Sequence, residues 1–255
     1  MNAKKPLVRD MAAGRSSLRG LAVLETFRAA RRPLSISELA RLGRMPVSTC
    51  HGVVRALERR GFLYFLSSRE CYPTRRLGEL AAALDANDPV IARVAPALAA
   101  LRDETGETAI LGVRQLDEVL YLLVVESPQA IRYSAHAGDR KPLHSSAIGK
   151  VMLAAMPEAE LAGWLKTHPL VRVTERTLTS ARRLRADLSA ALRNGYAVTR
   201  GENVTDVMAL AAPLRLAGRT FGVAVAGPLH RMEPNEARMA VRLRQCIRSL
   251  AWESP

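Results

Sequence analysis

Apolar residues recur at helical spacing near the start of the chain and predict an amphipathic helix over residues 17–30. Ser16 or Ser17 can cap its start, and the sequence Arg31-Arg32-Pro33 ends it. We expect its buried face to hold the residues that recur in steps of three, namely Leu18, Leu21, Leu24 and Phe27.

Two shorter helices follow. Ser35 and Glu38 have the spacing of a capping box, in which the N-cap side chain and the third helical residue each bond the other's backbone N–H. Gly43 ends that helix, and Pro46 stands where another begins, because a missing N–H costs nothing at a helix start. The next helix runs over residues 47–60, and its predicted inward residues are Val47, Cys50, Val53, Val54 and Leu57. Two short helices joined by a tight turn form a helix-turn-helix.

The pattern becomes strand-like after Gly61. Residues 62–66 and 71–72 predict a β-hairpin with a polar tip at residues 67–70. A helix-turn-helix followed by such a hairpin is a winged helix-turn-helix.

These elements divide the chain into four parts. We expect a flexible basic arm at residues 1–16, the winged helix-turn-helix domain at 17–74, a linker helix at 75–89 and a second domain at 90–255.

The second domain mixes helices with strands, which is typical of the α+β class. Helices are expected over residues 90–104, 146–156, 158–166, 180–194 and 235–251. Strands are expected over residues 109–114, 119–126, 131–135, 196–199, 207–214 and 220–226. One helix is expected to bury a face made of Leu184, Leu188 and Leu192.

The charge of the chain is uneven. All 255 residues together carry a net charge of +14, and residues 1–80 hold 16 lysines and arginines against 6 acidic residues, an excess of +10. A basic domain of this kind favours a polyanion, usually a nucleic acid. No apolar stretch is long enough for a membrane span and no signal sequence is evident, so we expect a cytoplasmic protein without a membrane partner.

Candidate DNA-reading residues stand at the start of the second helix of the helix-turn-helix, which lies in the major groove in such proteins. A hydroxyl can bond a phosphate or a base edge, and a valine can contact a thymine methyl group. Arg69 at the hairpin tip can reach a minor groove or a phosphate. The predicted DNA-binding residues are Arg44, Pro46, Val47, Ser48, Thr49, His51, Arg55 and Arg69.

Motifs for catalysis and metal binding are missing from the sequence. It has no G-x-S-x-G elbow, no phosphate-binding glycine loop and no metal spacing among its histidines, and its three cysteines are scattered. We therefore predict no enzymatic activity, no cofactor, no metal site and buried, unreactive thiols. An esterase-like hydrolase remains an alternative, with His144 beside Ser145 and Ser146 and with Asp139 as the third member.

The ordered motifs resemble those of the IclR family of bacterial transcription regulators, from about Leu18 to Leu250. In the first domain they are Leu34-Ser35-Ile36-Ser37-Glu38-Leu39-Ala40, Met45-Pro46-Val47-Ser48-Thr49, Leu57-Glu58-Arg59-Arg60-Gly61-Phe62-Leu63 and Tyr72 with Leu77-Gly78. In the second they are Gly138, Pro142-Leu143-His144-Ser145-Ser146-Ala147, Gly149-Lys150, Leu153-Ala154, Asn194-Gly195-Tyr196-Ala197, Ala211-Ala212-Pro213 and Gly227-Pro228.

The resemblance implies a winged helix-turn-helix joined by a linker helix to a GAF-like α+β effector-binding domain. It also implies a regulator that binds palindromic double-stranded operators as a dimer or a dimer of dimers. Its partners would be DNA, a second copy of itself and a small organic acid.

The resemblance further places an effector pocket between the sheet and the loop that enters the Gly149-Lys150 helix. Backbone N–H groups of Ser145, Ser146 and Ala147 would lie near that helix N-terminus, where carboxylates bind. A simple N-cap role for the serines is the alternative. The predicted effector-binding residues are Gly138, Ser145, Ser146, Ala147, Thr199, Ala209, Ala224 and Ala226.

The chain departs from the family pattern at both sites. Gly52 stands where a basic residue is common, and Arg44 stands where the turn glycine is usual. The far pocket wall has alanines where relatives that bind small polar acids place polar groups, so we expect an acid with an apolar or aromatic body. Gly52 also supports a second alternative, a small-molecule-binding protein with a degenerate DNA-binding domain.

Overall fold

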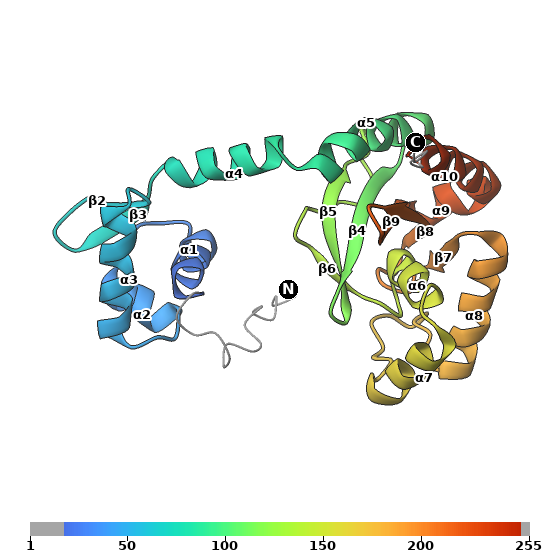
Figure 1. Cartoon of the computed structure of the whole chain (residues 1–255), viewed down its shortest axis with the longest axis horizontal. Coiled ribbons are helices and arrows are strands. Elements are labelled where there is room, and N and C mark those ends of the chain that lie inside the picture. Colours follow the sequence, from blue (N-terminus) through green and yellow to red (C-terminus); the bar gives the residue numbers. More distant parts are fainter. Residues whose placement is uncertain (1–17, 251–255) are drawn as a thin grey trace. The chain divides into compact units, whose positions relative to one another are not determined.

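The computed structural model describes residues 18–250 (Figure 1). The chain divides between Asn87 and Asp88 into two compact units, each with a buried core of its own. The predicted basic arm and its residues Arg9 and Arg15, like the predicted caps Ser16 and Ser17, lie outside the described residues. None of the helices between residues 18 and 250 is long and apolar enough to cross a membrane.

The first unit is a winged helix-turn-helix. Its elements are α1 (Arg19–Ala30), β1 (Leu34–Ser35), α2 (Ile36–Leu42), α3 (Val47–Arg59), β2 (Leu63–Phe65), β3 (Glu70–Pro73) and α4 (Arg76–Ala86). The strands form an antiparallel sheet in the order β1-β3-β2. The two-residue strand β1, which the sequence pattern did not predict, pairs Leu34 with Cys71 and so ties the start of α2 to the wing.

Local chemistry sets the boundaries of α2. The predicted capping box is confirmed, because the Ser35 hydroxyl accepts from the Glu38 N–H and the Glu38 carboxylate accepts from the Ser35 N–H. The turn after α2 places Arg44 in the left-handed region at φ 51°. The residue that stands in place of the usual glycine therefore takes the conformation for which glycine is suited.

Two predicted faces in this unit are wrong. In α1 the buried residues are Val23 and Phe27, whereas Leu18 and Leu21 are about half exposed. A spacing of four follows the helical period of 3.6 residues more closely than steps of three do. Val47 was expected to face inward, but it is 56% exposed because it occupies the first turn of α3, ahead of the buried Cys50.

The second unit is built on one antiparallel sheet. Its strands are β4 (Thr108–Gln115), β5 (Glu118–Val125), β6 (Arg140–Pro142), β7 (Ala197–Arg200), β8 (Val207–Leu216) and β9 (Arg219–Pro228). They lie in the order β6-β5-β4-β9-β8-β7, so β4 pairs with β9 across more than a hundred residues of sequence.

Helices cover both faces of this sheet (Figure 1). They are α5 (Pro89–Thr105), α6 (Ala147–Ala154), α7 (Glu158–Thr167), α8 (Ala181–Asn194), α9 (Leu229–Met232) and α10 (Glu236–Leu250), with a short 3-10 turn at Glu233–Asn235. One core packs α6, α7 and α8 against the sheet, and the other packs α5 and α10 against its opposite face. Alternate residues of β4 serve the two cores, with Ile110 on the first side and Leu111 on the second.

Two expectations fail in this unit. Residues 131–135 form no strand, although Tyr133 and Ala135 are buried alternately as in one, because the segment pairs with no neighbour and β6 takes the edge of the sheet instead. Leu192 is 64% exposed, and Ala191 joins the buried face of α8 in its place.

Candidate functional site

The N-terminal end of α3 presents most of the predicted DNA-reading residues to solvent. Pro46, Val47, Ser48 and His51 are exposed, and Thr49 is half-buried. The turn before the helix adds the exposed Arg44. Exposure at the first turn of the second helix is what insertion into a major groove requires.

The side chain of Arg55 is engaged within the first unit. Its guanidinium donates to Glu58 at 2.8 Å and lies 4.8 Å from the centre of the Phe65 ring on β2. The ion pair is exposed, so its net contribution to stability is small. The ion pair engages one nitrogen of a guanidinium that has five N–H donors, so a phosphate contact through Arg55 does not require loss of the Glu58 contact.

The tip of the wing holds Arg69. The Ser67 hydroxyl accepts from the backbone N–H groups of Arg69 and Glu70, at 3.3 and 3.1 Å, and this local turn shapes the tip. The Arg69 side chain is left exposed at the end of the hairpin.

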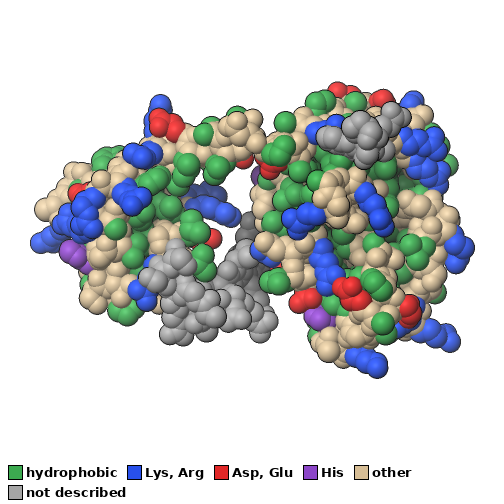
Figure 2. Space-filling view, in the orientation of Figure 1, with side chains coloured by type: hydrophobic (Ala, Val, Ile, Leu, Met, Phe, Trp, Pro, Cys, Tyr) green, Lys and Arg blue, Asp and Glu red, His purple; other side chains and the backbone are tan. Residues whose placement is uncertain are grey.

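Basic side chains gather on this unit. Figure 2 shows them over the region of α3 and the β2–β3 hairpin, beside a histidine. All basic residues between positions 18 and 87 are arginines, whose planar guanidinium groups suit bidentate contacts with phosphate.

Gly52 is exposed in the middle of α3, and a side chain at that position would meet no atom within 4 Å.

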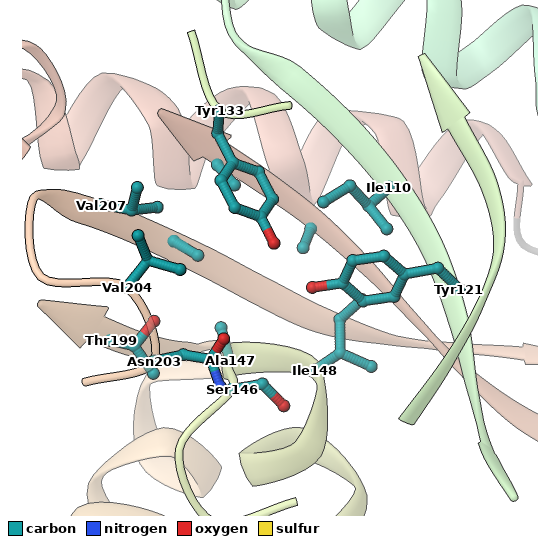
Figure 3. Close-up of a pocket in the computed structure, with 13 residues that line it drawn as sticks. Ile110, Tyr121, Tyr133, Ser146, Ala147, Ile148, Thr199, Asn203, Val204 and Val207 are labelled. Atoms are coloured by element: carbon teal, nitrogen blue, oxygen red, sulfur yellow. The ribbon is translucent and has the colours of Figure 1, made fainter. Parts of the chain in front are cut away.

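A pocket opens in the second unit between the sheet and the start of α6 (Figure 3). The space between its lining atoms, with the solvent at its open mouth included, is about 410 Å³. Six of the eight predicted residues line it, namely Ser146, Ala147, Thr199, Ala209, Ala224 and Ala226. Strand register brings the last four together, because Ala209 lies opposite both Thr199 and Ala226.

The other two predicted residues do not line the pocket. The Ser145 side chain is fully buried and accepts from Asn203 at 3.1 Å, so it supports the pocket wall from behind. Gly138 is exposed in the loop before β6 and has φ 89°, a turn conformation that favours glycine.

The start of α6 offers hydrogen-bond donors to the pocket. Ser146 caps the helix by accepting from the Gly149 N–H at 3.2 Å, as the N-cap alternative expected. Within residues 18–250 the N–H groups of Ala147 and Ile148 have no hydrogen-bond partner. Gly149 lets the incoming loop lie against the helix, because a side chain there would overlap the carbonyl group of Leu143.

Sequence reasoning missed seven pocket residues. They are Ile110, Tyr121, Tyr133, Ile148, Asn203, Val204 and Val207. Tyr121 and Tyr133 are almost buried, and Figure 3 shows their hydroxyl groups directed toward each other and into the pocket. Burial, together with the neighbouring Tyr133, holds the pKa of Tyr121 well above its usual value, so Tyr121 stays protonated at neutral pH. The sequence signal for Tyr133 is the alternation of apolar and polar residues over 131–135, which predicts a strand.

A buried cation lies next to this pocket. The Lys150 side chain on α6 is fully buried, and its ammonium group lies 2.7 Å from both Asp187 and Glu202. Burial raises the pKa of Glu202, and the positive charge of Lys150 opposes that rise. Glu202 directly precedes Asn203, so this cluster anchors the loop that forms one wall of the pocket.

The residues of the hydrolase alternative are engaged elsewhere. His144 Nε2 lies 2.9 Å from the carbonyl oxygen of Val171, and burial lowers the pKa of this histidine. The Ser146 hydroxyl donates to the carbonyl of Pro142 at 2.7 Å. Asp139 accepts from the backbone N–H of His136. The geometry thus pairs neither serine with His144 as a nucleophile with its base.

The cysteines are buried and unpaired, as predicted. Burial raises the pKa of Cys71 and of Cys246 to about 11, and also raises that of Cys50. The thiols are therefore protonated, and weak nucleophiles, at neutral pH.

Comparisons with known proteins cover nearly the whole chain. A model of the IclR helix-turn-helix domain matches residues 16–67, and a model described as bacterial transcriptional regulator IclR C-terminal matches residues 82–252. The HTH-type transcriptional regulator BhcR of Paracoccus denitrificans is 35% identical over 213 residues, which are 81% of this chain and 75% of that protein. The probable transcriptional regulator SauR of Cupriavidus necator is 31% identical over 85% of this chain and 87% of that protein.

Solved structures agree with this likeness. The Thermotoga maritima IclR has a TM-score of 0.74 and 25% identity, over 93% of this chain and 99% of that one. An IclR homolog from Microbacterium hydrocarbonoxydans, complexed with 4-hydroxybenzoate, has a TM-score of 0.70 and 28% identity, over 91% of this chain and 98% of that one.

Proposed function

The chain belongs to the IclR family of bacterial transcriptional regulators, and from this premise we propose a DNA-binding regulator that is controlled by a small carboxylic acid. The observation that carries the proposal is the pocket at the start of α6, which has free helical N–H groups at one side and an apolar wall at the other. The IclR homolog complexed with 4-hydroxybenzoate supports a ligand of this class.

The DNA contact assigns different tasks to different residues. Ser48, Thr49 and His51 at the exposed start of α3 read base edges, whereas Arg44, Arg55 and Arg69 neutralise phosphates. Substitution of Thr49 or His51 by alanine should relax sequence specificity. Substitution of Arg9 or Arg15 should lower affinity equally on all sequences and flatten its salt dependence. Uniform losses from both sets would contradict this division.

The proposal includes self-association on a palindromic operator, as a dimer or a dimer of dimers. The exposed apolar residues of the first unit support it, because α4 buries none of its residues within the chain and leaves Leu80 and Leu84 exposed at 47% and 66%. A two-fold symmetric protein matches a two-fold symmetric operator. The GAF-like character of the second domain remains a prediction from the resemblance.

The acid binds with its carboxylate at the N–H groups of Ala147 and Ile148, where the helix dipole favours negative charge. Thr199 adds a hydroxyl from β7, and Ala209, Ala224 and Ala226 contact the apolar body. Binding changes DNA affinity only to the extent that the acid has different affinities for the DNA-competent state and for the other state.

A second candidate is a small-molecule-binding protein whose first unit no longer reads DNA. Gly52 favours it, since the exposed centre of α3 lacks both a cation and a strong helix former.

The test is binding of the full chain to the DNA that flanks its own gene, measured by fluorescence anisotropy with random-sequence competitor at two salt concentrations. The titration is repeated with aromatic and aliphatic acids. Binding that survives competitor and shifts with an acid supports the regulator. Binding that competitor or salt abolishes leaves only polyanion affinity and favours the second candidate. Tighter binding of small oxo-acids than of aromatic acids would contradict the apolar-body assignment.

A further inference from the structure

The polar groups of the pocket fall into two sets that come from different elements. The start of α6, Thr199 on β7 and Asn203 in the loop after it form one set. The hydroxyl groups of Tyr121 on β5 and Tyr133 in the loop before β6 form the other. Figure 3 shows the tyrosine hydroxyls across the pocket from Ser146 and Thr199. A ligand that fills the pocket therefore meets hydrogen-bonding groups at both of its ends.

The tyrosine pair lies in an apolar and nearly closed environment. Tyr121 is 6% exposed and Tyr133 is 9% exposed. The two hydroxyls are directed toward each other (Figure 3), and within residues 18–250 neither is hydrogen-bonded to any other residue. A buried hydroxyl without enough partners costs free energy, so a ligand group that completes these bonds gains affinity.

The hydrogen-bonding capacity of the pair selects the ligand group. Two neighbouring hydroxyls keep at least one proton to donate to a ligand, and both retain lone pairs to accept. A hydroxyl group on the ligand donates and accepts at once and satisfies both needs. An ether or a halogen can only accept, and a methyl group or a hydrogen atom satisfies neither need.

The surrounding contacts hold Tyr133 in place. Its carbonyl oxygen accepts from the buried Thr108 hydroxyl at 2.6 Å. Two residues earlier, the carbonyl of Ile131 accepts from Arg231 at 3.0 Å, and Arg231 is itself paired with the buried carboxylate of Glu107. The loop is thus anchored at two points to β4 and α9, which positions the Tyr133 hydroxyl before a ligand arrives.

We propose that Tyr121 and Tyr133 select an aromatic acid that carries a ring hydroxyl, with the carboxylate at α6 and the hydroxyl at the tyrosine pair. This inference rests on the proposed function and narrows its ligand class. A site built to bond a hydroxyl rejects the analogue that lacks it, because its own buried polar groups are then left unpaired.

The experiment is calorimetric titration of the full chain with benzoate, 3-hydroxybenzoate, 4-hydroxybenzoate, 4-methoxybenzoate and phenol. We expect one of the hydroxybenzoates to bind about 10- to 100-fold more tightly than benzoate, and the methoxy compound not to recover this gain. Equal affinities for benzoate and both hydroxybenzoates would overturn the inference and leave the proposed function intact. Phenol that binds as tightly as the hydroxybenzoates would support the tyrosine pair and contradict the carboxylate effector.

Variants distinguish a specific role of the two tyrosine hydroxyls from a general effect on the structure of the domain. Tyr121→Phe and Tyr133→Phe should each lower the preference for the hydroxybenzoate at least about fivefold and leave benzoate affinity unchanged. Tyr196→Phe is the matched control, because Tyr196 lies outside the pocket beneath the guanidinium of Arg244. Thermal unfolding shows whether each variant is folded. A folded double Phe variant that keeps the full preference, or a wild-type chain that binds none of the compounds, would overturn the inference.

Discussion

The ammonium nitrogen of Lys150 lies 2.7 Å from a carboxylate oxygen of Glu202, and both side chains are buried. The second oxygen of Glu202 is buried without a hydrogen-bond partner among the described residues. Since Glu202 is followed by the pocket residue Asn203, one ion pair connects the helix that offers N–H groups to the ligand with a loop that lines the same pocket.

Loss of the Lys150 cation should destabilise the second unit. Lys150→Met keeps the volume of the side chain but leaves Glu202 buried without a counter-charge, and such a change costs about 3–5 kcal/mol. Urea unfolding followed by tryptophan fluorescence, to which the buried Trp164 of this unit contributes, measures it. Glu202→Gln is the milder control, because its amide oxygen can still accept from Lys150. A Lys150→Met chain as stable as the wild type would show that the pair adds nothing to the fold.

Gly52 should limit both the stability of α3 and its affinity for DNA. Gly52→Ala is expected to stabilise the first unit by about 1 kcal/mol, because the site is an exposed helix interior with room for a side chain. Gly52→Arg should give a similar gain and also tighten DNA binding, with a slope of log affinity against log salt that is steeper by about 1. The alanine variant is the control without added charge. Unequal salt slopes are the expected result, and equal slopes would exclude a phosphate contact at this position.

Arg44 should lower the stability of the first unit and contribute to its affinity for DNA. Its backbone is left-handed at φ 51°, which costs a side-chain-bearing residue more than glycine, so Arg44→Gly should raise stability by about 0.5–1 kcal/mol. The same variant should weaken DNA binding, since it removes an exposed cation.

Leu116→Gly is the matched control for Arg44→Gly. Leu116 has φ 56°, is 82% exposed and lies in the β4–β5 turn of the other unit. Its replacement should raise stability to a similar extent and leave DNA binding unchanged. If Arg44→Gly and Leu116→Gly bound DNA with the same affinity, Arg44 would not contribute to DNA binding.

The capping box of α2 should give the first unit a pH-dependent stability. Hydrogen bonds from the Ser35 backbone N–H and from Arg32 lower the pKa of Glu38 from 4.5 to about 2. For a carboxylate whose pKa is lowered by folding, the stabilisation is complete above pH 4.5 and disappears as the pH falls toward 2. Unfolding of the wild type and of Glu38→Gln, compared at about pH 6 and about pH 3, should show a larger difference at the higher pH. If the difference in stability between the wild type and Glu38→Gln were the same at both pH values, the effect of Glu38 would not come from its charge.

The sequence was sufficient to predict the structural features that depend on residues close together along the chain. The capping box of Ser35 and Glu38, the helix stop at Gly61 and the N-cap of α6 at Ser146 each involve residues at most four positions apart. Their hydrogen bonds close within one turn, so residue type and spacing determine them. The motifs that resemble the family added the pocket alanines, which spacing alone does not bring together.

Only the tertiary structure decided what lies across the pocket. Tyr121 and Tyr133 come from β5 and from an irregular loop, and both meet Ala224 and Ala226 only because β4 pairs with β9 beside them. The contact of Lys150 with Glu202 spans 52 residues in the same way. Such contacts are set by the order of strands and by the packing of side chains between layers. The periodicity of residues along the chain does not predict them. The sequence by itself therefore determined the helices, the wing and the family, whereas strand order and packing decided which side chains meet in the pocket.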